Sequence, residues 1–91
     1  MELDLSYTEI SFLGVEECGI TLPNLVKLTM IGCRKLDDQG LQSVLRICGR
    51  SLRELDLSAT GISMVGIHEC GTTLPHLENL NVTGCEKLSI P

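Results

Sequence analysis

Residues 25–33 of the chain read L-V-K-L-T-M-I-G-C, and this stretch decides the fold that the sequence predicts. The same spacing of apolar positions returns at residues 52–60, which read L-R-E-L-D-L-S-A-T, and at residues 77–85, which read L-E-N-L-N-V-T-G-C. A shorter copy, M-E-L-D-L-S-Y-T, occupies residues 1–8. Apolar residues two positions apart within each copy predict a short strand with one buried face.

A longer period lies over the short one. Glu2 and Glu54 are 52 residues apart, and at that offset residues 3–6 (L-D-L-S) match residues 55–58 (L-D-L-S). The four strand copies are spaced by 25, 27 and 25 residues. Such spacings resemble those of leucine-rich repeats, in which each repeat is one strand and one helix. We call these repeats coils and place them at about 1–25, 26–52, 53–77 and 78–91, the last truncated, in a single domain of residues 1–91.

The second half of each of the first three coils predicts a helix. The candidate N-cap residues are Ser11, then Asp37 or Asp38, then Ser63, and Gly49 is expected to end the second helix. Apolar residues at helical spacing predict the inward faces: Val15, Cys18 and Leu22; Leu41, Val44, Leu45 and Cys48; Ile67, Cys70 and Leu74. The predicted fold class is therefore α/β, as a right-handed leucine-rich-repeat solenoid: an arc of a horseshoe with a parallel inner sheet of about four strands and outer helices.

Composition narrows the classes of partner and the compartment. The 91 residues carry a net charge of -5, which gives no basic surface for nucleic acid or for an anionic membrane. No apolar run approaches the ~20 residues that span a bilayer, and the N-terminal residues are already repeat sequence rather than a secretory signal. The five cysteines are odd in number and fall on repeat positions, so we expect reduced, buried thiols in the cytoplasm or nucleus.

The residues of coil 2 resemble the cysteine-containing leucine-rich repeats of F-box proteins. The positions that carry the resemblance are Leu25, Leu28, Met30, Cys33, Leu36, Asp37, Gly40, Leu41, Val44, Leu45, Cys48 and Leu52. Coils 1 and 3 depart from the pattern, since Thr8 and Thr60 stand at the first cysteine position. The resemblance implies that the chain belongs to the substrate-recognition part of a ubiquitin ligase.

Alternate residues of each strand are expected to face away from the helices, on the concave side, and to align in columns across the sheet. These residues form a predicted protein-binding face: Glu2, Asp4, Lys27, Thr29, Ile31, Glu54, Asp56, Ser58, Asn79 and Asn81. The four carboxylates would act as acidic anchors for a basic segment of the partner, with Ile31 as an exposed apolar contact. The simpler interpretation is a solvated sheet face whose charges prevent aggregation.

No enzyme, cofactor or metal site is predicted. A catalytic site needs a nucleophile, a base and an orienting group that converge, and the repeat singles out none. The cysteines form no C-x-x-C pair, and Cys33 and Cys85 lie two strands apart. Two non-enzymatic alternatives stay open. One is a scaffold or sensor repeat with no ubiquitin link, which an F-box in upstream sequence would argue against. The other is a structural array segment that self-associates through uncapped ends.

Overall fold

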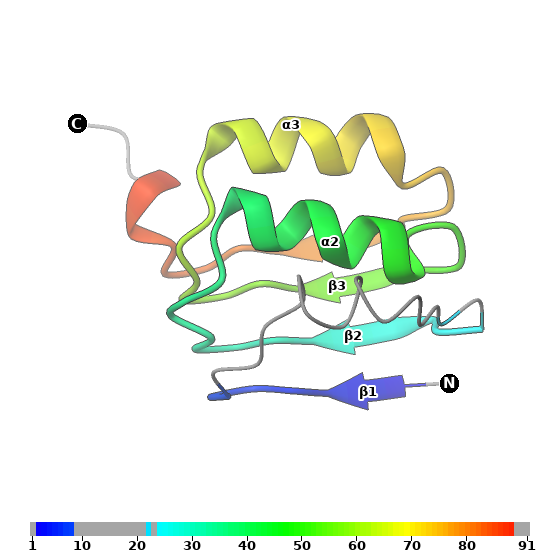
Figure 1. Cartoon of the computed structure of the whole chain (residues 1–91), viewed down its shortest axis with the longest axis horizontal. Coiled ribbons are helices and arrows are strands. Elements are labelled where there is room, and N and C mark those ends of the chain that lie inside the picture. The colour runs from blue at the N-terminus through cyan, green and yellow to red at the C-terminus, as the bar shows by residue number, and fades with distance from the viewer. Residues whose placement is uncertain (1, 9–21, 23, 89–91) are drawn as a thin grey trace.

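The computed structural model describes residues 2–8, 22 and 24–88. Along the chain the elements are β1 (Glu2–Asp4), β2 (Lys27–Thr29), α2 (Asp38–Cys48), β3 (Glu54–Asp56), α3 (Met64–Thr73), β4 (Asn79–Asn81) and the short 3-10 helix η1 (Glu86–Leu88). One strand falls in each of the four predicted coils (Figure 1). The helix expected in coil 1, with its cap Ser11, and the residue Cys18 lie outside the described residues.

The four strands form one parallel sheet in the order β1-β2-β3-β4. Equivalent residues of the repeats pair directly, so that Leu3 lies opposite Leu28, Leu28 opposite Leu55, and Leu55 opposite Leu80. Each strand ends one residue earlier than its apolar alternation predicts. The structure therefore confirms the α/β class, the parallel four-stranded sheet and a helix in each of coils 2 and 3.

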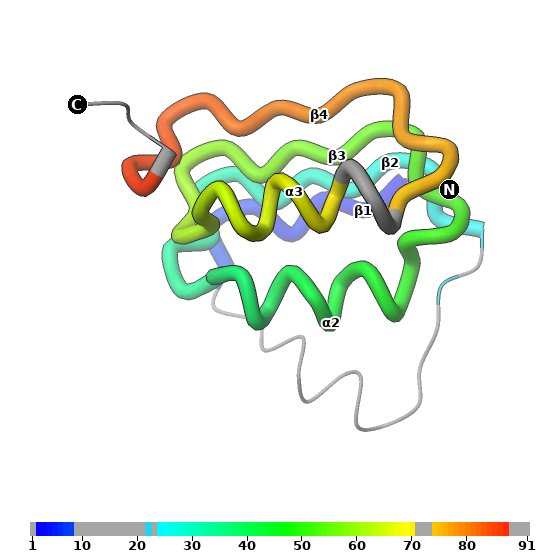
Figure 2. The backbone as a smooth tube through the Cα atoms, turned by 90° about the horizontal axis from the view of Figure 1, so that it is seen from above, coloured from blue at the N-terminus to red at the C-terminus, as the bar shows by residue number. Residues whose placement is uncertain are grey.

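The two helices begin where the sequence places their caps. Asp37 is the N-cap of α2, and its Oδ1 accepts a hydrogen bond of 2.9 Å from the N–H of Gly40. Ser63 is the N-cap of α3, and its hydroxyl oxygen accepts from the N–H of Val65. Gly49 ends α2 as predicted, with its N–H bonded to the carbonyl of Leu45. Both helices lie on one face of the sheet, and neither α2 nor α3 covers the other face (Figures 1 and 2).

The core lies between the sheet and the helices, and among the described residues coils 2 and 3 supply most of it. Its fully buried members are Leu25, Leu28, Met30, Leu41, Val44, Leu52, Leu55, Leu57, Ile62 and Cys70. On α2, the predicted inward residue Leu45 is only half-buried, whereas Ile47 is buried in its place. The described cysteines, Cys33, Cys48, Cys70 and Cys85, are free and buried, as the repeat pattern predicts. Small polarizable thiols fill narrow spaces in such a thin core.

The turn that leaves each strand contains one residue in the left-handed region. These residues are Tyr7 and Ala59, with φ of 61° and 56°, and Gly32 and Gly84, with φ of 74° and 76°. Glycine accepts this conformation at little cost, whereas a residue with a Cβ pays roughly 1–2 kcal/mol. The turn geometry is thus common to all four coils, although only coils 2 and 4 have a glycine at this position.

The two edges of the sheet are less well covered than its centre. Leu28 and Leu55, in the inner strands, are 1% and 2% exposed, whereas Leu3, Leu5, Leu80 and Val82 near the edges are only partly buried. None of the helices in the described part of the chain has both the length and the apolar character that a bilayer crossing requires.

Candidate functional site

The face of the sheet that neither α2 nor α3 covers corresponds to the predicted concave face, and strand pairing sorts its side chains into columns. The outer column is Glu2, Lys27, Glu54 and Asn79, and the inner column is Asp4, Thr29, Asp56 and Asn81. Glu2 and Asn79 are exposed, while Lys27 and Glu54 are half-buried between their neighbours. The structure thus brings eight of the ten predicted face residues together as two aligned rows across four strands.

In the outer column, opposite charges meet at Lys27 and Glu2. The Nζ of Lys27 lies 3.9 Å from Oε1 of Glu2, and the two side chains are 45% and 75% exposed. Ion pairs this long and this exposed contribute roughly 0–1 kcal/mol to stability. Because this pair is weak, a cationic group of a ligand could replace Lys27 as the partner of Glu2.

The inner column has a structural task that the sequence did not reveal. In three of its four members, a side-chain oxygen of the last strand residue accepts a hydrogen bond from the backbone two residues ahead: Asp4 from Ser6 at 2.9 Å, Asp56 from Ser58 at 3.0 Å, and Asn81 from Thr83 at 3.0 Å. Such Asx turns bend the chain out of the strand. Hydrogen bonds from the hydroxyl and the N–H of Ser6 lower the pKa of the Asp4 carboxyl.

Two predicted face residues beyond the strand ends differ from expectation. Ser58 is only 9% exposed, because the turn folds its hydroxyl back onto Oδ1 of Asp56 at 2.6 Å and its carbonyl accepts from the N–H of Gly32. Ile31 is half-buried rather than exposed, and its N–H donates to the hydroxyl of Ser6 at 3.1 Å. At Ser58 the Asx turn after β3 ends the alternation of strand residues, so this side chain is buried rather than exposed as predicted.

A column of threonine and cysteine runs beneath these turns. The hydroxyl of Thr8 and the thiol of Cys33 both donate to the carbonyl of Leu5, at 2.7 and 3.1 Å. One repeat pair later, Thr60 and Cys85 both donate to the carbonyl of Leu57, also at 2.7 and 3.1 Å. These thiols and hydroxyls satisfy the carbonyl groups of Leu5 and Leu57, the residues that directly follow β1 and β3. Their residue types follow the repeat, and their contacts are those of structural groups.

The thiols of the helices are also unsuited to nucleophilic or metal chemistry. Burial raises the pKa of Cys48 and of Cys70 to about 11, and the carboxylates of Glu69 and Asp38 add to the shift at Cys70. A thiol with such a pKa stays protonated near neutral pH, and the thiolate is the reactive and metal-binding form. Within the described residues no group of three or more His, Cys, Asp and Glu side chains is placed to hold a metal ion.

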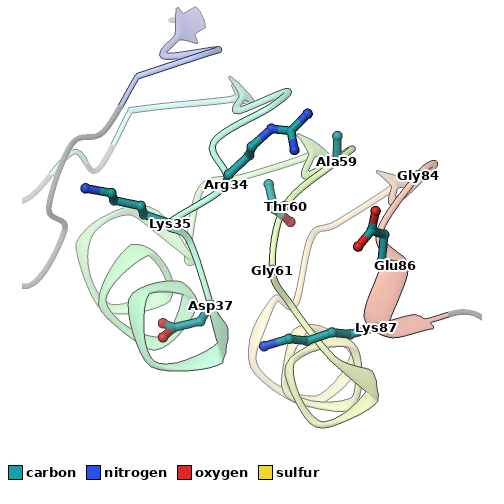
Figure 3. Close-up of a pocket in the computed structure, with 9 residues that line it drawn as sticks. All are labelled: Arg34, Lys35, Asp37, Ala59, Thr60, Gly61, Gly84, Glu86 and Lys87. Carbon is teal, nitrogen blue, oxygen red and sulfur yellow. The ribbon is translucent and has the colours of Figure 1, made fainter.

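A second candidate lies where the strands lead into the helices. A pocket of about 460 Å³ is lined by Arg34, Lys35, Asp37, Ala59, Thr60, Gly61, Gly84, Glu86 and Lys87. Figure 3 shows Arg34 and Glu86 on opposite sides of Ala59 and Thr60, and Lys35 pointing away from them. The carboxyl ends of parallel strands often hold ligands in α/β proteins, which is what makes this position notable.

The chemistry of the pocket is weakly defined. Its lining residues include three cations and two carboxylates, and one of the carboxylates, Asp37, already caps α2. Its hydroxyl, on Thr60, is 6% exposed and donates to the carbonyl of Leu57. In the sequence Arg34 and Lys35 are two adjacent basic residues with no motif around them that predicts a site. Their position beside η1 depends on the stacking of coils 2 to 4, which local sequence does not display.

Comparisons of the chain with models of protein families, with curated proteins and with solved structures found no significant match to any of them.

Proposed function

We propose that the chain is an arc of a leucine-rich-repeat solenoid that binds a protein partner, without catalysis, on the helix-free face of its sheet. The observation that carries the proposal is the in-register outer column, in which the carboxylates of Glu2 and Glu54 flank the cation of Lys27. Solenoids commonly use the inner strand face for extended contacts with other proteins.

The expected partner presents an extended basic segment. Four carboxylates from Glu2, Asp4, Glu54 and Asp56 stand on this face against the one cation of Lys27 among its column residues. Adjacent parallel strands lie ~4.8 Å apart, so a peptide crossing the strands meets a new side chain at each such step. Charge of this kind contributes mainly to the rate of association and to the choice of partner.

The resemblance of coil 2 to F-box leucine-rich repeats supports a more specific role, in which the face receives a substrate of a ubiquitin ligase in the cytoplasm or nucleus. A scaffold or sensor role without ubiquitin uses the same face in the same way. The identity of the captured partner, and whether it carries ubiquitin, separates these two roles.

The direct test uses a fluorescent peptide of alternating lysine and serine and measures its binding by anisotropy. Glu2→Lys with Glu54→Lys, which reverses two outer-column charges, is expected to weaken binding at least about tenfold. The matched control, Glu78→Lys with Glu86→Lys, makes the same change in net charge at two exposed residues outside the columns. We avoid Asp56 because its substitution would also break the turn at Ser58.

Equal loss of binding in both double variants would contradict the proposal, since it would reduce the effect to net charge. The same two double variants are then used as baits to capture proteins from a eukaryotic lysate, and the captured proteins are identified by mass spectrometry. Proteins that the control retains and the outer-column variant loses are partners of this face.

A further inference from the structure

The outer edges of β4 and β1 carry the same pattern of backbone hydrogen-bonding groups as β2 and β3, the two strands that pair at the centre of the sheet. Between β2 and β3, the N–H groups of Met30 and Gly32 donate to the carbonyls of Asp56 and Ser58, at 2.8 and 2.9 Å. The N–H of Glu54 donates in the other direction, to the carbonyl of Val26 at 3.0 Å. These bonds define which atoms of coil 2 meet which atoms of coil 3.

The edge at β4 presents the coil 2 side of that junction. Leu80, Val82 and Gly84 stand 52 residues after Leu28, Met30 and Gly32. On β4, the carbonyls of Asn81 and Thr83 accept from Leu57 and Ala59 of coil 3. Because successive residues of a strand direct their backbone groups to opposite sides, Val82 and Gly84 direct theirs away from β3.

The edge at β1 presents the coil 3 side. Leu5 and Tyr7 donate to the carbonyls of Thr29 and Ile31 in coil 2, which turns the backbone groups of Asp4 and Ser6 outward. Asp4 and Ser6 are the same residue types as Asp56 and Ser58, 52 positions earlier. The left-handed turn residue and the Asx turn also recur in both places.

We propose that the β4 edge of one chain pairs with the β1 edge of a second copy, in parallel and in the register of the β2–β3 junction. In this arrangement Val82 and Gly84 donate to the carbonyls of Asp4 and Ser6 of the second copy, and Asn79 lies beside Glu2. The contact is heterologous, because a different edge of each copy takes part, so it continues from copy to copy.

Burial and charge both favour this pairing. The half-buried Leu80 and Val82 would meet the half-buried Leu3 and Leu5 of the second copy, as Leu28 and Met30 meet Leu55 and Leu57 within the chain. On the helix-free face, the neutral Asn79 and Asn81 would stand beside Glu2 and Asp4. Pairing two β1 edges would instead bring like charges together, which destabilises strand pairs.

The first test is the weight-average mass of the purified chain by sedimentation over a hundredfold range of concentration. The mass is expected to rise steadily above that of one chain. Val82→Pro removes an outward donor that the β3 pairing does not use, and we expect it to raise the dissociation constant at least about tenfold. A mass equal to one chain throughout the range would overturn the proposal.

The second test fixes the polarity by cross-linking and does not depend on the folding of the proline variant. Glu2→Cys chains are mixed with Asn79→Cys chains of different tag length and mildly oxidised. In-register neighbours in adjacent strands have Cα atoms ~5 Å apart, within disulfide reach, whereas Glu2 and Asn79 of one chain are three strands apart.

Mixed disulfide dimers should therefore clearly exceed the half share that random pairing gives. A mixture of Glu2→Cys with Glu86→Cys, an exposed position on η1, provides the control and should pair at random. A random share in both mixtures would overturn the head-to-tail register even if the mass rises with concentration.

Discussion

At the scale of single residues, the last residue of a strand both holds the following turn and, where it is an aspartate, adds an ionisable carboxylate. Asp4, Asp56 and Asn81 each hold the turn that follows through one side-chain oxygen. Asn81 shows that the amide serves the turn as well as a carboxylate does. A carboxylate differs in that its hydrogen bonds are strongest when it is ionised, so its contribution to stability depends on pH.

We expect Asp4→Asn to flatten the acid limb of the stability curve. Since the hydrogen bonds from Ser6 lower the pKa of Asp4 in the folded state, its contribution is complete above the unfolded-state pKa of about 4 and is lost as pH falls through the folded-state value. Urea unfolding between pH 7 and pH 2 measures this. Glu86→Gln, which removes an exposed carboxylate, is the control. Parallel curves for wild type and Asp4→Asn would contradict the assignment.

At the scale of elements, the helices are joined at their N-terminal ends by one side chain. Oδ1 of Asp38, in the first turn of α2, accepts from the N–H of Ser63 at 2.7 Å, and its Oδ2 accepts from the Ser63 hydroxyl. Gly66 leaves the space that the carboxylate fills, since a Cβ there would collide with Oδ1 of Asp38. The start of α3 is therefore positioned by a residue of α2.

Replacing Asp38 with alanine is expected to lower the free energy of unfolding by about 1–3 kcal/mol, because it removes the charged acceptor of two hydrogen bonds in a partly buried setting. Asp38→Asn keeps one acceptor and should lose less. Gln42→Ala, which breaks the 3.1 Å bond from α2 to Glu69 on α3, supplies a comparison on the same pair of helices. This role would be refuted if chemical denaturation showed a larger loss of the free energy of unfolding for Gln42→Ala than for Asp38→Ala.

Prediction from sequence succeeded where repetition carried the signal and failed where a contact crossed between coils. The strand register follows from aligning Leu28 with Leu55, and the sequence narrows the cap of α2 to Asp37 or Asp38, of which Asp37 is the cap in the structure. The bond between Asp38 and Ser63, by contrast, joins residues 25 positions apart and has no signal in the sequence. The burial of Ser58 and the pocket at Arg34 likewise depend on how neighbouring turns pack, which no single repeat encodes.

At the scale of the whole molecule, the most deeply buried of the described side chains belong mainly to the two inner coils. We expect Leu55→Ala, at a side chain 2% exposed, to cost about 2–5 kcal/mol, which is a large share of the stability of a domain this size. Leu80→Ala makes the same change at the partly buried edge and should cost about half as much. Both are compared by urea unfolding at low protein concentration. Equal losses of the free energy of unfolding in the two variants would contradict the prediction that the inner strand contributes more to stability than the edge strand.

The alternation of residue types down the stack bears on how the molecule arose. Turn residues with positive φ read Tyr, Gly, Ala, Gly along the chain, and the hydrogen-bonded column beneath reads Thr, Cys, Thr, Cys. The pattern of residue types thus repeats every two coils rather than every coil. An unequal exchange between the genes for two such copies would insert or delete 52 residues and still leave every strand beside a neighbour of its accustomed kind. A change in repeat number by whole pairs of coils would therefore preserve the register of the sheet.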